Sequence, residues 1–191
     1  MTKSILLVGV GGQGTILASK ILSQGLLQSG YDVKMSEIHG MSQRGGSVST
    51  HVRYGEKVYS PVIEKGGADI LVSFEQMEAL RWLEYVKPTA KAVVNSQVIN
   101  PMPVLIGQAE YSDKILDEIS SKIQTTVLDA YGEAAKLGNS RAQNLLLLGA
   151  TAKLMGLTDI DWNAIISAAV RPAFVDINQK AFARGIEMVL A

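Results

Sequence analysis

The sequence predicts an α/β fold of three layers, with a Rossmann-like start, a mixed β-sheet and a helical C-terminal segment. Three observations indicate this class. An apolar run at residues 4–10 leads through a glycine-rich turn into a helical pattern. Strand and helix patterns then alternate as far as residue 129, as in proteins with helices packed on a sheet. From residue 131 onward, only helical patterns follow.

The first unit consists of a strand at residues 4–10, the turn GVGGQGT at residues 9–15, and a helix. In this setting the pattern G-x-G-x-x-G has a physical meaning. Gly9 permits a tight turn, Gly11 lets the backbone approach a ligand, and Gly14 lets helix and strand pack closely. The amides that begin the helix would then face an anion. A tight turn that binds nothing is the alternative interpretation.

A second strand is expected at residues 31–36, and a loop rich in polar groups follows it. Glu37 stands near the position, ~20 residues beyond the glycines, where a dinucleotide-binding fold places its ribose-binding acid. Polar side chains at high density beside two glycines favour a binding loop over a linker. The candidates in this loop are Glu37, His39, Gln43, Arg44, Gly45 and Gly46.

A dinucleotide-binding unit should continue into a helix here, but the sequence continues into further strands. Residues 47–53 alternate as a strand does, and a fourth strand is expected at residues 57–60 after a turn at Gly55. Two strands joined so closely predict a hairpin, and therefore a mixed sheet.

The remaining elements follow from periodicity and capping signals. Asn139 or Ser140 should cap a long helix that ends at Gly156, and its run at residues 145–148 reads as core. No linker or repeat interrupts the chain, so residues 1–191 are expected to form one domain. The other expected elements are strands at 68–74, 91–95 and 122–129, a loop at 100–103, and helices at 75–85, 112–121 and 131–137, from 162, and from about 172.

Composition excludes several classes of protein. Eighteen basic residues balance eighteen acidic ones, which argues against nucleic-acid binding. No apolar run approaches the ~20 residues that span a bilayer, and no signal-peptide pattern is present, so we expect a soluble cytoplasmic protein. The sequence has no cysteine, hence no thiolate nucleophile and no cysteine ligands for iron–sulfur clusters. The sequence has only two histidines, His39 and His51, which does not favour a dedicated metal site. His51 is expected to be structural or to lie on the surface. For His39, a role in contacting a ligand or partner remains an open alternative.

Several stretches together resemble a known family. The turn GVGGQGT and the segment SEIHGMSQRGGSVSTHVR at residues 36–53 are similar to the gamma-type subunits of 2-oxoacid:ferredoxin oxidoreductases. The form HGMSQRGG at residues 39–46 is most similar to the branch of small (beta) subunits of indolepyruvate ferredoxin oxidoreductases. The resemblance spans most of the chain, continuing at residues 58–63, 67–75, 78–81 with Tyr85, 139–144 and 148–150.

The resemblance implies a division of labour between subunits. Thiamine diphosphate, magnesium and the iron–sulfur clusters are expected in a large catalytic partner, and this chain would shape the site beside them without binding a cofactor alone. Coenzyme A and ferredoxin would act through the complex, which would oxidatively decarboxylate an aryl 2-oxoacid such as indolepyruvate. No acid–base pair or nucleophilic triad is evident, so we assign this chain no catalytic residue and no metal ligand.

The candidate ligand or partner contacts are Gly9, Gly11, Gly12, Gln13, Gly14, Glu37, His39, Gln43, Arg44, Gly45 and Gly46. Within this set, Arg44 would be the main anion contact, unless it pairs with an acid of this chain such as Glu37 and merely holds the loop. Two other functions remain as alternatives: a stand-alone dinucleotide-binding module, and a scaffold without ligand contacts. The sequence leaves open whether the isolated chain forms a homodimer.

Overall fold

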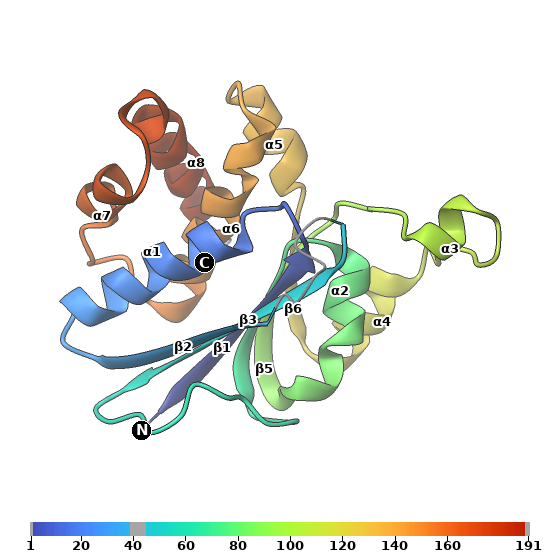
Figure 1. Ribbon diagram of the computed structural model, residues 1–191, viewed down its shortest axis with the longest axis horizontal. Helices are drawn as coiled ribbons and strands as arrows, with labels where there is room; N and C mark the ends of the chain where they lie inside the picture. Colours follow the sequence, from blue (N-terminus) through green and yellow to red (C-terminus); the bar gives the residue numbers. More distant parts are fainter. Residues whose placement is uncertain (1, 39–44, 190–191) are drawn as a thin grey trace.

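A six-stranded sheet forms the centre of the molecule in the computed structural model, which describes residues 2–38 and 45–189 (Figure 1). The strand order is β2-β3-β1-β4-β5-β6. The strands are β1 (Lys3–Val10), β2 (Asp32–Ile38), β3 (Ser47–Gly55), β4 (Ala68–Ser73), β5 (Val86–Asn95) and β6 (Gln124–Leu128).

The sheet is mixed, as the sequence predicts. Strands β1, β4, β5 and β6 pair in parallel, whereas β3 lies antiparallel to both β1 and β2. The predicted hairpin partner at residues 57–60 is wrong, because that segment forms no strand. Both edges of β3 are already paired, so its hydrogen-bonding groups have no room for another strand. The segment is instead held by a side chain: the Val58 amide donates to Asp32 Oδ2 at 2.9 Å.

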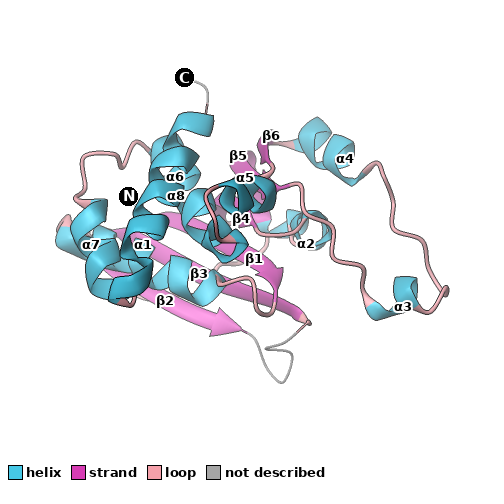
Figure 2. Ribbon diagram, turned by 90° about the horizontal axis from the view of Figure 1, so that it is seen from above, coloured by secondary structure: helices cyan, strands magenta, loops and turns pink. Residues whose placement is uncertain are grey.

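Helices cover both faces of the sheet and complete the three layers (Figures 1 and 2). One face carries α1 (Thr15–Gln28), α5 (Ala130–Lys136), α6 (Gln143–Met155), α7 (Trp162–Ala169) and α8 (Val175–Met188). The other carries α2 (Gln76–Arg81) and α4 (Ile115–Lys122). Short 3-10 turns lie at Leu83–Tyr85, Ser140–Ala142 and Pro172–Phe174. The predicted α/β class with a helical C-terminal part is confirmed.

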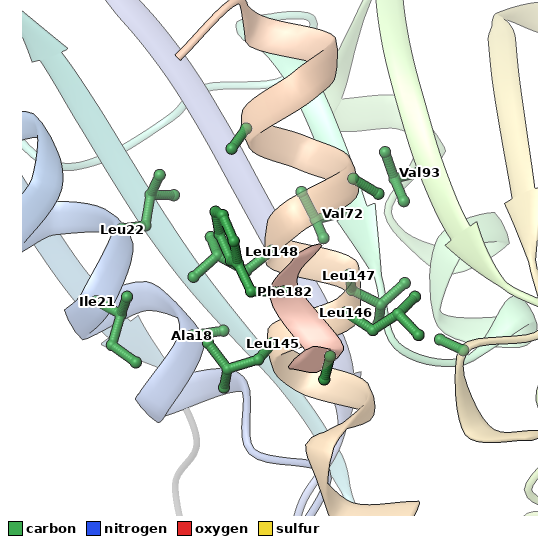
Figure 3. Packing of buried hydrophobic residues seen from close by; sticks show 14 of the residues in the cluster. Ala18, Ile21, Leu22, Val72, Val93, Leu145, Leu146, Leu147, Leu148 and Phe182 are labelled. Atoms are coloured by element: carbon green, nitrogen blue, oxygen red, sulfur yellow. The ribbon is translucent and has the colours of Figure 1, made fainter. Parts of the chain in front are cut away.

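The larger core lies between the sheet and a layer formed by α1 and the helices of the C-terminal part (Figure 3). Leu145, Leu146, Leu147 and Leu148 are all buried, which confirms the prediction that this run is core. Helix α6 has apolar residues all round because it is enclosed by the sheet on one side and by α8 on the other. A second core, built around Leu71, Ile115 and Ile119, packs α2 and α4 on the opposite face.

Several boundaries differ from the prediction. Strand β5 begins at Val86, before Pro88, where pairing with β4 shifts register between Ala68 and Ile70. Such an irregularity tolerates a proline that lacks an N–H group. A short helix, α3 (Met102–Leu105), stands in the predicted loop and projects away from the body of the molecule (Figure 2).

The second histidine is structural. His51 is 3% exposed, and its Nδ1 accepts a 3.0 Å hydrogen bond from the Ile63 amide. Its ring lies edge-on to Trp82 and Tyr85. Burial lowers the pKa of this imidazole, so the neutral form is favoured. No helix within residues 2–38 and 45–189 has the length and apolar character needed to cross a membrane.

Candidate functional site

The carboxyl ends of β1 and β4 lie side by side at one edge of the sheet. The chain leaves β1 into α1 on one face of the sheet, and it leaves β4 into α2 on the other (Figure 1). Ligand sites of open α/β sheets form at such a switch point, because the two connections diverge and leave a crevice. The glycine-rich turn lies in this place.

The glycine-rich turn is joined directly to Gly45 and Gly46. The Gly11 amide donates to the Gly46 carbonyl at 2.8 Å, and the Gly11 carbonyl accepts from the Gly45 amide at 3.1 Å. These bonds continue the ladder between β1 and β3 beyond Val10 and Ser47. Two motifs that are far apart in sequence therefore form one structure.

The buried side chain of Gln13 stabilises this structure through hydrogen bonds. It is 8% exposed, and its Oε1 accepts from the Val10 amide at 2.8 Å. Its Nε2 donates to the Phe74 carbonyl at 2.7 Å and to Gln97 Oε1 at 2.9 Å. Gln13 thus fastens the turn to the ends of the neighbouring strands, and these hydrogen bonds direct its amide into the protein.

A second buried amide extends the same network. Asn95 is fully buried at the end of β5, and its Oδ1 accepts from the Ala130 amide at 3.1 Å. Its Nδ2 donates to the Phe74 carbonyl at 3.1 Å and to Gln143 Oε1 at 2.9 Å. The network satisfies the backbone groups left free where the strands end. The sequence did not predict either amide as part of the site: no local pattern distinguishes Asn95, and Gln143 was marked only by the resemblance at residues 139–144.

The three remaining glycines of the turn have different surroundings. A Cβ on Gly9 would lie 2.9 Å from both Gln13 Oε1 and Phe74 Cβ, so this position is closely packed. Gly14 has φ +84, and a Cβ there would lie 2.5 Å from Asn144 Nδ2. Its close contact is therefore with α6 and not, as predicted, with the strand. Gly12 has φ +104 but faces open space.

A cleft of about 550 Å³ opens on the α1 side of the turn. We call it the arginine cleft, because Arg141 and Arg171 both line it and no acidic residue does so within the described chain. The sequence marked residues 139–144 only as a cap and as part of the resemblance. The predicted cap of the long helix is wrong: Asn139 Oδ1 accepts from the Arg141 amide at 3.0 Å and so caps the 3-10 turn Ser140–Ala142, whereas α6 begins after Ala142 without a side-chain cap. The other lining residues are Gly12, Gln13, Gly14, Leu17, Ala142, Gln143, Asn144, Ala169, Val170, Phe174 and Asn178.

A second hollow, lined by two carboxylates, lies beside Gly45 and Gly46. Glu75 and Glu78 line a hollow of about 240 Å³ together with these glycines. Ser47 donates a short hydrogen bond to Glu78, and Arg81 Nε lies 3.1 Å from its other oxygen. Burial raises the pKa of the Glu78 carboxyl despite these two partners. This hollow thus carries two carboxylates and the guanidinium of Arg81, whereas no acidic residue lines the arginine cleft.

Glu37 does not lie where a dinucleotide-binding fold needs its acid. It sits on β2 opposite Thr50 of β3, and β3 separates β2 from β1. In that fold, the strand carrying the acid lies directly beside the first strand. The half-buried Glu37 leaves its Oε1 without a hydrogen-bond partner among the described residues. The topology therefore does not favour the alternative of a stand-alone dinucleotide-binding module.

Three of the predicted site residues, His39, Gln43 and Arg44, lie outside the residues that the structure describes. Within residues 2–38 and 45–189, no group of three His, Asp or Glu side chains is placed to hold a metal ion. The structure brings Gly9, Gly11, Gly12, Gln13 and Gly14 together with Gly45 and Gly46, and it places Glu37 on a more distant strand.

Comparison with known proteins adds a family to this geometry. Residues 4–188 match the model of the family described as pyruvate ferredoxin/flavodoxin oxidoreductase. The chain belongs to this family. It is similar to the indolepyruvate oxidoreductase subunit IorB of Thermococcus kodakarensis, at 36% identity over 96% of this chain and 94% of the relative. The IorB subunit of Pyrococcus horikoshii is 37% identical with the same coverage.

Solved structures share the fold. The gamma subunit of a keto/oxoacid ferredoxin oxidoreductase from Geobacter sulfurreducens matches with a TM-score of 0.72, at 24% identity over 97% of both chains. A 2-oxoglutarate:ferredoxin oxidoreductase chain from Magnetococcus marinus matches with a TM-score of 0.78 at 18% identity, over 98% of this chain and 31% of the longer one. The same fold thus occurs both as a separate chain and within a longer one.

Proposed function

We propose that this protein is the small subunit of a 2-oxoacid:ferredoxin oxidoreductase that acts on an aryl 2-oxoacid such as indolepyruvate. The observation that carries the proposal is the gradient of similarity within the family. Four IorB subunits of indolepyruvate oxidoreductases match at 33–37% identity over nearly their whole length. Subunits of 2-oxoglutarate synthases and of pyruvate/ketoisovalerate oxidoreductases match at only 24–25%.

The cofactors would belong to a large partner subunit. This chain has no cysteine to ligate a cluster, which fits a partner that carries the iron–sulfur clusters, thiamine diphosphate and magnesium. Thiamine diphosphate, when bound there, supplies the chemistry that breaks the bond between the carboxylate and the 2-oxo carbon. Coenzyme A accepts the acyl group, carbon dioxide leaves, and ferredoxin takes the electrons.

The part of this chain that meets the partner would be the segment from Glu37 to Gly46. Its downstream end is fixed by the hydrogen bonds between Gly11 and Gly45–Gly46, and Gln13 holds the turn beneath them. A rigid base lets a short segment present side chains to a neighbouring subunit in a defined position. We therefore place Arg44, which precedes Gly45 in the sequence, toward the partner's active site or the path of coenzyme A, as an anion contact.

Co-purification from the native organism tests this function. The chain, tagged at its chromosomal locus, should bring down one large subunit together with iron, sulfide and thiamine diphosphate. That complex should convert indolepyruvate and coenzyme A to an acyl-CoA while reducing ferredoxin. The chain expressed alone should contain no iron and show no activity. Recovery of the tagged chain without such a partner, with tight NAD binding instead, would contradict the proposal.

A further inference from the structure

The arginine cleft has the charge of an anion site. Arg141 precedes α6 and Arg171 follows α7, so different parts of the fold bring two guanidinium groups to one hollow. Neither arginine forms an ion pair with any residue that the structure describes, whereas Arg81 and Arg184 each pair with a glutamate. Both side chains are therefore available to bind a ligand.

The beginning of α1 also borders this hollow, since Gly14 and Leu17 line it, whereas Thr15 and Ile16 line a neighbouring hollow beside β3. The N-cap of this helix is Gly14, which offers no capping side chain, and the first turn of the helix contains no acidic residue. The first amides of a helix lack partners within it and carry a partial positive charge. In most helices a Ser, Thr, Asp or Asn side chain accepts from one of these amides, but α1 lacks that acceptor.

Gln143 is the observation that points independently to a ligand. It is 6% exposed and lines the cleft. The Ala130 amide fixes the orientation of Asn95, so Asn95 Nδ2 must donate to the oxygen of Gln143. This leaves Gln143 Nε2 without a hydrogen-bond partner among the described residues. This N–H group is not fully buried, and because Gln143 lines the cleft, a ligand acceptor there can take its hydrogen bond.

The remaining wall is apolar. Leu17, Val170 and the half-exposed ring of Phe174 line the cleft beside the charged groups. A volume of about 550 Å³ lies in the range of pockets for small molecules, roughly 300–1,000 Å³, and exceeds the needs of a single phosphate. An aromatic face beside two guanidinium groups suits a flat ring attached to a phosphate.

We propose that the arginine cleft binds a phosphate-bearing ligand of nucleotide size. Arg141 and Arg171 hold the phosphate near the start of α1, Gln143 Nε2 donates to a ligand oxygen, and Phe174 contacts the ring. The cleft lies wholly within this chain, so binding does not require a partner subunit. Ligand binding in the arginine cleft can therefore be tested independently of the proposed oxidoreductase function.

Calorimetric titration of the isolated chain with pyrophosphate, ADP and coenzyme A tests the site. All three carry phosphate, and their relative affinities separate a general nucleotide site, where ADP and coenzyme A bind alike, from one adapted to coenzyme A, where it binds tighter than ADP. Arg141→Gln and Arg171→Gln should each weaken binding at least tenfold, because each removes a charged hydrogen-bond donor. Lys153→Gln, which removes a charge at the other end of α6, should bind as the unchanged chain does.

Gln143→Glu provides a further variant. It keeps the acceptor for Asn95 but places a carboxylate at the cleft, so it should abolish binding while circular dichroism remains unchanged. If this variant does not fold, the two arginine variants still decide the matter. Failure of pyrophosphate, ADP and coenzyme A to bind at millimolar concentration would overturn the proposal. So would binding that both arginine variants retain at full strength.

Discussion

The backbone amide of Gly11 donates a hydrogen bond of 2.8 Å to the carbonyl of Gly46, which joins the glycine-rich turn to the end of the polar loop. Gly45 returns a second bond to the Gly11 carbonyl. The turn after β1 therefore acts as the support on which the downstream end of the loop rests. A substitution in the turn should consequently alter the contacts that the loop makes.

Gly11→Val tests this relationship. A branched side chain at Gly11 should hinder the backbone pairing with Gly45 and Gly46, and so displace the base of the loop. The activity of the assembled complex should fall at least tenfold, while circular dichroism of the isolated chain stays unchanged. Unchanged activity would mean that the turn has no functional role beyond connecting β1 to α1.

Gly14→Ala should destabilise the chain. The position has φ +84, and a Cβ would lie 2.5 Å from Asn144 Nδ2. Backbone strain alone should cost about 1–2 kcal/mol, and displacement of Asn144 should add to it. Gly12→Ala is the matched control, because it shares the positive φ but faces open space. Urea unfolding of both variants measures the difference, and equal destabilisation would contradict a packing role for Gly14.

The sequence indicated the glycine-rich turn and the polar loop, but not that they pair with each other. Periodicity places a strand without showing which neighbour it chooses. Here β3 inserts between β1 and β2, which removed the expected hairpin and moved Glu37 away from the turn. The sequence did not predict Arg141 and Arg171 as site residues, for a related reason. They lie in connections without periodicity, and only the packing of the C-terminal helices on α1 brings them together.

Replacement of Glu78 by Gln should alter the pH dependence of stability. Burial raises the pKa of this carboxyl, so the folded chain holds the proton more tightly than the unfolded chain does. The resulting stabilisation is complete below the ordinary glutamate pKa of about 4.3, and it is lost as the pH rises through the raised pKa. Glu78→Gln, which resembles the protonated form, should therefore match the unchanged chain near pH 4 and exceed its stability near pH 7.

Urea unfolding at several pH values measures this crossover. Glu84→Gln is the control, since Glu84 is exposed and, among the residues that the structure describes, forms an ion pair with Lys65 alone. The free energy of unfolding of Glu84→Gln should not rise above that of the unchanged chain as the pH increases. A Glu78→Gln variant that is less stable than the unchanged chain at neutral pH would show that Ser47 and Arg81 outweigh the cost of burying the charge.

Tyr111→Phe should loosen the segment that carries α3. The Tyr111 hydroxyl donates to Glu75 and accepts from the Met77 amide at 3.2 Å, and Glu75 also accepts from the Ile99 amide at 3.2 Å. One carboxylate thus holds both ends of this segment. Amides between residues 99 and 111 should exchange faster with solvent in the variant. Tyr59→Phe, at a side chain that is 90% exposed, should have no effect. Unchanged amide exchange in Tyr111→Phe would show that the Tyr111–Glu75 hydrogen bond does not hold this segment.

The most direct measurement of the central claim is a reconstitution titration. The large subunit recovered with this chain by co-purification is prepared alone. This chain is then added in increasing amounts while indolepyruvate-dependent reduction of a viologen dye is followed in the presence of coenzyme A. Either chain alone should have negligible activity, and activity should rise until it saturates at a fixed molar ratio of the two. Full activity of the large subunit without this chain would show that this chain is not a required subunit.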